Sequence, residues 1–140
     1  MPSGQQQSHA DGYGISLLSP QHDRDDRDFD VDIVFIHGLG GKRHKTWTKG
    51  DCCWPRDLLA KDFPKARIMT WGYDSRVMKF FGPVGQGSIH SHANELNNDL
   101  SQERSEPHQI FRPLIFFAHS LGGLVLKHVS DGKTSMLHYS

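Results

Sequence analysis

Three short apolar runs stand out along an otherwise polar chain. They occupy residues 31–36 (VDIVFI), 66–71 (ARIMTW) and 114–118 (LIFFA), and β-branched and aromatic residues are frequent in them. Runs of five or six such residues, ended by glycine or by a polar residue, are typical of strands that are covered on both faces. We therefore predict three buried strands at these positions.

The segments between and after these runs have the features of helices. Residues 51–63 carry Pro55 in the expected first turn and end before Pro64, which predicts a helix with an N-terminal proline. Residues 122–129 follow the last strand and are mostly apolar. A further helix is predicted where apolar positions recur at steps of three and four, at Ile89, Ala93, Leu96 and Leu100.

Strands and helices therefore alternate, which predicts the α/β class. Such alternation favours a parallel sheet with helices on both faces, a three-layer sandwich. We expect residues 1–29, rich in glutamine and in alternating charges, to be a disordered polar leader. Residues 30–129 would form one partial domain, and residues 130–140 an irregular tail.

Composition excludes several classes of function. The formal net charge is zero and acidic and basic residues are mixed, so no nucleic-acid footprint is expected. Cys52 and Cys53 are adjacent, a spacing that rarely permits a disulfide, and a reducing compartment fits best. We see no membrane span, signal peptide, metal-ligand spacing or cofactor motif. We therefore expect an intracellular protein without cofactor or metal.

The most informative segment is residues 117–123, FAHSLGG, where a predicted strand meets a predicted helix. This is the context in which the G-x-S-x-G motif places a nucleophilic serine on a sharp turn. Ser120 is the candidate nucleophile. Gly122 supplies the small residue required after it, and Ala118 replaces the glycine usually found before it. The alternative for Ser120, a helix N-cap without catalytic role, remains open on this segment alone.

A second glycine-rich segment, residues 37–41 (HGLGG), directly follows the first strand. An α/β-hydrolase takes one oxyanion donor from the residue after its nucleophile and another from a loop after an earlier strand. The donors here would be the backbone N–H groups of Leu121 and Leu39. Arg43 stands where a phosphate-binding P-loop needs Ser or Thr and where a dinucleotide fingerprint needs its third glycine, so both are disfavoured. The residues expected to support the two turns are His37, Gly38, Gly40, Gly41, Ala118, His119, Gly122 and Gly123.

At these motifs the chain resembles the serine-active-site-containing protein family and related serine esterases. The resemblance covers about residues 31–128 and rests on the segments 34–41, 46–47, 53–59, 72–74 and 119–127, with the predicted helix around Ala93. It implies a lipase-like α/β-hydrolase fold, with Ser120 as nucleophile and Leu39 and Leu121 at the oxyanion hole. It also implies a small-molecule or lipid ester substrate, a link to lipid metabolism, and peripheral association with mitochondrial or endoplasmic reticulum membranes.

The remainder of a catalytic triad is not evident. In this fold the acid and the histidine follow the serine on later loops, whereas about ten polar residues follow the last predicted helix. Asp131 and His138 occur in the required order, but no strand would carry them to Ser120. We expect a C-terminally truncated domain, weakly active or inactive as a serine hydrolase. The alternative is a non-catalytic pseudo-hydrolase interaction module, or the N-terminal remnant of a larger signalling protein.

Overall fold

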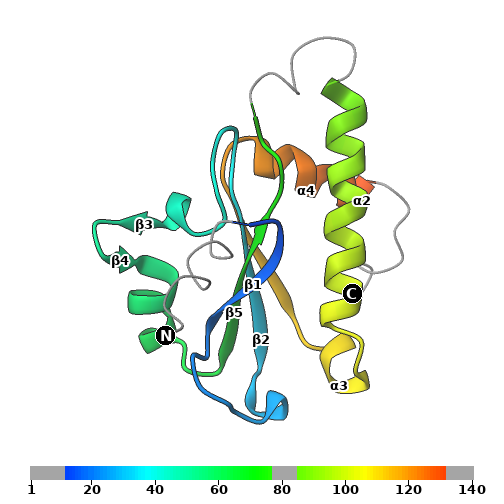
Figure 1. Ribbon diagram of the computed structural model, residues 1–140. Helices are drawn as coiled ribbons and strands as arrows, with labels where there is room; N and C mark the ends of the chain where they lie inside the picture. Colours follow the sequence, from blue (N-terminus) through cyan, green and yellow to red (C-terminus); the bar gives the residue numbers. More distant parts are fainter. Residues whose placement is uncertain (1–11, 77–84, 132–140) are drawn as a thin grey trace, which may run out of the picture.

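The computed structural model describes residues 12–76 and 85–131, and it places a four-stranded mixed sheet at the centre (Figure 1). The strand order is β1 (Gly14–Ser19), β5 (Ala66–Gly72), β2 (Val31–Ile36) and β6 (Leu114–Ala118). The three strands predicted from the sequence are confirmed, and they are mutually parallel. The chain therefore belongs to the α/β type.

β2 lies between its two parallel neighbours, and five of its six residues are buried. Val34 pairs with Met69 of β5 on one side and with Phe116 of β6 on the other. Its continuous apolar run is explained by this position, because both faces of a central parallel strand are covered by other elements.

The expectation that residues 1–29 lie outside the fold is wrong for the part that the structure describes. Residues 14–19 form β1, which pairs antiparallel with β5, so the sheet is not wholly parallel. Leu18 is 2% exposed and packs in the core, whereas Leu17 is 50% exposed. An edge strand with one solvated face needs few apolar residues. The charged residues that follow β1 therefore led to the prediction of a disordered segment. Residues 1–11 lie outside the described part.

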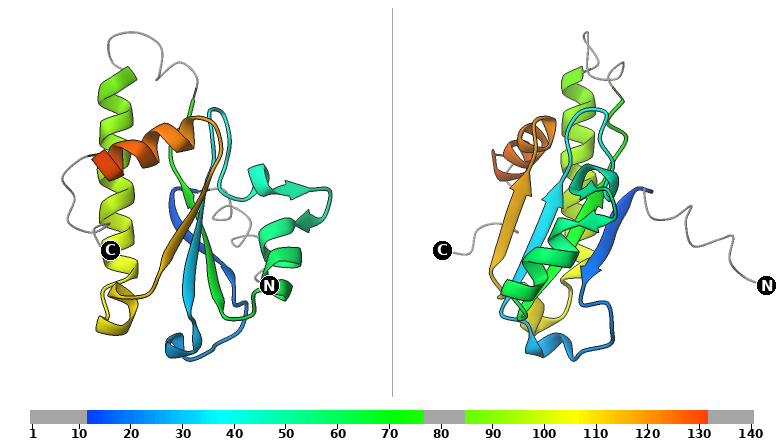
Figure 2. Two further views of the ribbon diagram at one scale, coloured as in Figure 1. Left: turned by 180° about the vertical axis from the view of Figure 1, so that it is seen from behind. Right: turned by 90° about the vertical axis from the view of Figure 1, so that its left-hand side faces the viewer.

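Helices cover both faces of the sheet (Figure 2). On one face, α2 (Gly85–Glu103) and α4 (Leu121–Asp131) pack on β2 and β5 around a core centred on Val34, Ile36 and Met69. On the other, the single-turn segments η3 (Pro55–Leu59) and α1 (Ala60–Asp62) flank a second core that includes Ile33 and Phe35. None of the helices within 12–76 and 85–131 has the length and apolarity needed to cross a bilayer.

The helix predicted for residues 51–63 is wrong at its beginning. Cys52–Cys53 forms β4, which pairs with β3 (Thr48–Lys49) in a small hairpin after the 3-10 turn η2 (Lys45–Trp47). The Cys53 N–H donates to Asp57 Oδ2 at 2.8 Å, and this bond links the hairpin to the following π-helical turn. Helical pairing therefore begins only near Pro55, at the position where proline is tolerated.

Charged side chains are buried at the end of the sheet where the parallel strands begin. Asp32, fully buried in β2, accepts two hydrogen bonds from Arg67 at 2.9 and 3.0 Å and one from Arg112 at 2.9 Å. Arg104 forms a third ion pair with it at 3.0 Å. Arg112 also binds Asp26 of the 3-10 turn η1 (Asp26–Asp28). This amino-end charge cluster ties η1 and the short helix α3 (Pro107–Ile110) to the sheet.

Candidate functional site

Ser120 lies at the sharp turn between β6 and α4, as the motif requires. Its φ is 54°, in the left-handed region that non-glycine residues seldom occupy. The turn is closed by the Gly122 N–H, which donates to the His119 carbonyl at 3.0 Å, and by the Gly123 N–H, which donates to the Ser120 carbonyl at 2.9 Å. Ser120 is exposed at the N-terminus of an eleven-residue helix. Strained backbone of this kind is frequent at active sites.

Gly122 allows α4 to approach the end of β2. A Cβ atom at this position would lie 2.6 Å from the His37 carbonyl oxygen and 2.7 Å from that of Ile36. The His119 N–H also donates to the Ile36 carbonyl at 3.0 Å. The small residue predicted at 122 is therefore needed for packing. At Gly123 a Cβ would meet no atom within 4 Å, so packing does not require glycine there.

The HGLGG turn lies directly against Ser120. A Cβ on Gly38 would be 2.9 Å from the Ser120 Cβ and 2.7 Å from the His119 carbonyl oxygen. The Gly40 N–H donates to the Ser75 carbonyl at 2.7 Å, and the Gly41 N–H donates to the Gly38 carbonyl at 3.0 Å. Two turns that are eighty residues apart in sequence therefore touch.

The amides proposed as oxyanion donors belong to Leu39, exposed on the glycine turn, and to Leu121, the first residue of α4. Within residues 12–76 and 85–131, neither amide donates to a backbone carbonyl or to a side chain. Amides at the first turn of a helix have no intrahelical acceptor, and they favour bound negative charge. Each of the two N–H groups is therefore free to donate a hydrogen bond.

His37 is buried beneath the glycine turn and has both ring nitrogens engaged. The Tyr73 N–H donates to Nε2 at 3.3 Å, so the proton resides on Nδ1, which donates to the Gly38 carbonyl at 3.0 Å. The Tyr73 ring stacks on His37 with centroids 4.4 Å apart, and its hydroxyl donates to the His37 carbonyl at 2.8 Å. Burial raises the pKa of Tyr73, so the hydroxyl keeps its proton. Both ring nitrogens of His37 are therefore held by backbone groups, an arrangement that favours a structural role.

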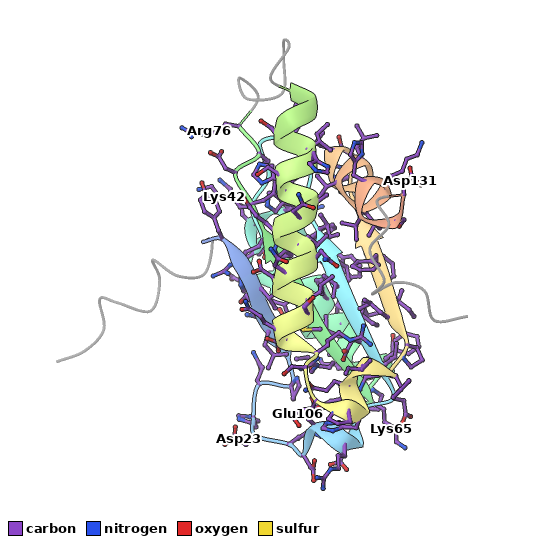
Figure 3. The ribbon with its side chains drawn as sticks, turned by 90° about the vertical axis from the view of Figure 1, so that its right-hand side faces the viewer. Asp23, Lys42, Lys65, Arg76, Glu106 and Asp131 are labelled. Atoms are coloured by element: carbon purple, nitrogen blue, oxygen red, sulfur yellow. The ribbon has the colours of Figure 1, made fainter. Side chains whose placement is uncertain are left out.

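The His119 ring lies close to the glycine turn. The residue is exposed, and its Nδ1 would lie 2.9 Å from a Cβ on Gly38, on the side where Ser120 lies. Asp131 is at the far end of α4 (Figure 3), about 15 Å along the helix from Leu121 at 1.5 Å per residue. His138 lies outside the described residues. The acid and base of a triad therefore stay unassigned.

A pocket of about 300 Å³ adjoins the glycine turn, at the carboxyl ends of β2 and β5. Ligands of open α/β sheets bind at this edge. Ser120 does not line the pocket; residues that do include Tyr13, Gly40, Gly41, Tyr73 and Arg76. Arg76 binds Asp74 through two hydrogen bonds at 2.9 and 2.7 Å, and Figure 3 shows Arg76 at the same end of the molecule as Lys42. Residues 12–76 and 85–131 hold no grouping of side chains suited to a metal ion.

Sequence reasoning missed two residues that contact this region. Tyr13 precedes the unexpected strand β1, and no pattern in the polar N-terminal segment marked it. Tyr73 follows the predicted strand 66–71 within the segment Gly72–Asp74, which was noted for its resemblance but not for a contact with His37. The signal that could have found Tyr73 is its place directly after a parallel strand, next to the strand that ends just before His37.

Comparison with known proteins finds similarity to one group. The chain is 32% identical to Protein SERAC1 of Homo sapiens and 33% identical to Protein SERAC1 of Mus musculus, each over 133 residues. Protein SERAC1 of Danio rerio is 29% identical over 131 residues. Each match covers 81% of this chain and 20% of the relative, so the chain spans about a fifth of their length. No family model matches, and no solved structure matches.

Proposed function

We propose that this chain supplies the nucleophile and the oxyanion-binding turns of a serine hydrolase with an α/β-hydrolase fold. Its substrate would be a carboxylic ester, either a small molecule or a lipid. The observation that carries the proposal is the direct contact between Gly38 and Ser120, the latter held at φ 54° at the start of α4. That contact supports the proposal because it brings the glycine turn that carries the Leu39 amide next to the turn that carries Ser120.

The proposed reaction follows from this arrangement. Ser120 Oγ attacks the ester carbonyl, and the negative charge that develops on the carbonyl oxygen is received by the amides of Leu39 and Leu121. The C–O bond to the alcohol then breaks, the alcohol leaves with the proton of the serine hydroxyl, and water hydrolyses the acyl-serine. A serine without a base is a weak nucleophile, and within 12–76 and 85–131 no histidine bonds to Ser120, so we expect slow turnover.

Labelling with a fluorophosphonate probe tests the proposal. Wild-type protein should form a covalent adduct at Ser120, and Ser120→Ala should form none. Ser130→Ala is the matched control, because Ser130 is an exposed serine of the same helix whose hydroxyl bonds to the Leu126 carbonyl. The control should label like wild type. Labelling that persists in Ser120→Ala would contradict the assignment of the nucleophile.

A second candidate is a non-catalytic interaction module. It is favoured by β6, an edge strand in the described sheet, where Ile115 is 47% exposed and Phe117 is 42% exposed. Apolar edge strands commonly bind another polypeptide. If wild type, Ser120→Ala and Ser130→Ala all fail to react with the probe while their circular dichroism spectra show folded protein, this candidate is favoured over the hydrolase.

The membrane location implied by the resemblance is likewise a proposal, which fractionation of mitochondria and endoplasmic reticulum would test.

A further inference from the structure

Tyr73 makes three separate contacts with one residue at the base of the glycine turn. Its backbone N–H donates to His37 Nε2, its hydroxyl donates to the His37 carbonyl, and its ring stacks on the imidazole at 4.4 Å. Both residues are buried. Tyr73, which follows the adjacent strand β5, therefore helps to fix the ring orientation, the tautomer and the backbone position of His37.

Gly38 connects His37 to Ser120. His37 Nδ1 donates to the Gly38 carbonyl, and Gly38 in turn touches Ser120. The peptide bond that follows Gly38 carries the Leu39 N–H, so the direction of that amide depends on the orientation of the Gly38 carbonyl. A change at Tyr73 would rotate the donor without touching a substrate.

The same extended segment holds the other end of the turn. Ser75, two residues after Tyr73, accepts the Gly40 N–H at its carbonyl and donates its hydroxyl to the Gly41 carbonyl at 3.1 Å. The Tyr73 ring also stacks on the Trp71 ring, with centroids 5.0 Å apart. The indole N–H of Trp71 donates to Asp99 of α2 at 2.8 Å. The turn is therefore anchored to a rigid core.

We propose that Tyr73 is a positioning residue, which holds the turn formed by residues 38–41 so that the Leu39 amide faces the oxyanion formed at Ser120. This inference rests on the proposed function. The competing explanation is that Tyr73 only fills the core, in which case its loss would lower stability without a specific effect at the turn.

Tyr73→Phe removes the hydroxyl and keeps the ring. Trp71→Phe is the matched control, because it loses a part-buried hydrogen bond in the same stack, one that leads to Asp99 of α2 and not to His37. Two measurements separate the explanations: the saturation kinetics of fluorophosphonate labelling, and the hydrogen exchange of the Gly40 and Gly41 amides by NMR.

We expect Tyr73→Phe to lower the maximal labelling rate about tenfold, less than the loss of a whole oxyanion donor, with unchanged half-saturating probe concentration. Exchange at Gly40 and Gly41 should accelerate about tenfold, because their hydrogen bonds form only while the turn is closed. Trp71→Phe should change neither, although both variants unfold at lower temperature.

Equal effects of the two variants on rate and exchange would overturn the inference and leave the hydrolase proposal intact. If wild-type protein does not react with the probe, the proposed function fails. Hydrogen exchange of the Gly40 and Gly41 amides then tests by itself whether Tyr73 holds the turn. Faster exchange at Gly40 and Gly41 in Tyr73→Phe only would then uphold the positioning of the turn, and unchanged exchange would refute it.

Discussion

The two ends of the parallel strands are held together in opposite ways. At the amino ends, Asp32 is surrounded by three arginine side chains, which reach it from β5 and from the segments on either side of α3. At the carboxyl ends, the contacts between β2, β6 and α4 depend on missing side chains, at Gly38 and Gly122. One end is fastened by long side chains and the other by backbone groups that approach one another directly.

The two ends should therefore tolerate different kinds of substitution. Buried ion pairs are sensitive to the removal of a partner, because a charge left alone in the interior is strongly unfavourable. Close backbone contacts are sensitive to the addition of atoms, because a packed interior cannot absorb an extra methyl group without displacement. Substitutions that delete atoms and substitutions that add them should therefore separate the two ends.

The largest effect is expected at the amino end, for Asp32→Ala. Removal of this carboxylate leaves the buried guanidinium groups of Arg67, Arg104 and Arg112 without their shared partner, so the free energy of unfolding should fall by about 3–5 kcal/mol. Urea denaturation measures it. Asp30→Ala is the control, since Asp30 pairs with Lys65 at 3.8 Å between largely exposed side chains and should lose less than about 1 kcal/mol. Similar losses in both variants would refute the importance of the cluster.

At the carboxyl end, Gly122→Ala and Gly123→Ala form a matched pair one residue apart. The first adds a methyl group against two backbone oxygens and should destabilise the protein by about 1–3 kcal/mol. The second adds the same group in open space within a helix and should stabilise it by roughly 0.5–1 kcal/mol. Thermal unfolding followed by circular dichroism measures both. Equal responses would show that α4 does not pack closely on β2.

A smaller, pH-dependent effect is expected at Asp26. Burial alone would raise the pKa of Asp26, but hydrogen bonds from Arg112, Gln109 and His108 and the nearby charge of Arg67 lower it well below its usual range. The carboxylate therefore stabilises the fold above the unfolded pKa of about 4, and this contribution is lost as the pH falls toward the folded pKa.

Asp26→Asn should consequently lose about 1 kcal/mol relative to wild type at pH 7, and the difference should shrink steadily below about pH 4. Urea denaturation at a series of pH values from 7 to 2 measures it. A difference that stays constant over this range would show that the Asp26 charge contributes nothing to stability.

Several parts of this structure could be predicted from the sequence because they follow from local patterns. The three parallel strands are contiguous apolar runs, and the turn at Ser120 follows from the fixed spacing of small residues around it. β1 could not be predicted because an edge strand carries only a weak alternation. The amino-end charge cluster was also missed, since Asp32 meets Arg112 eighty residues away and sequence spacing gives no sign of that contact. The contacts of Tyr73 with His37 depend on the pairing of β2 with β5, which appears only in three dimensions.

Ser120 occupies a backbone conformation that an L-residue adopts at an expense of about 1–2 kcal/mol and that glycine adopts freely. A protein selected only for thermal resistance would therefore favour glycine at this position. Serine at this position therefore lowers the free energy of unfolding below the value that glycine would give, and the Ser120→Gly protein should unfold at a higher temperature than wild type. Screens that reward stability alone would thus tend to replace this serine.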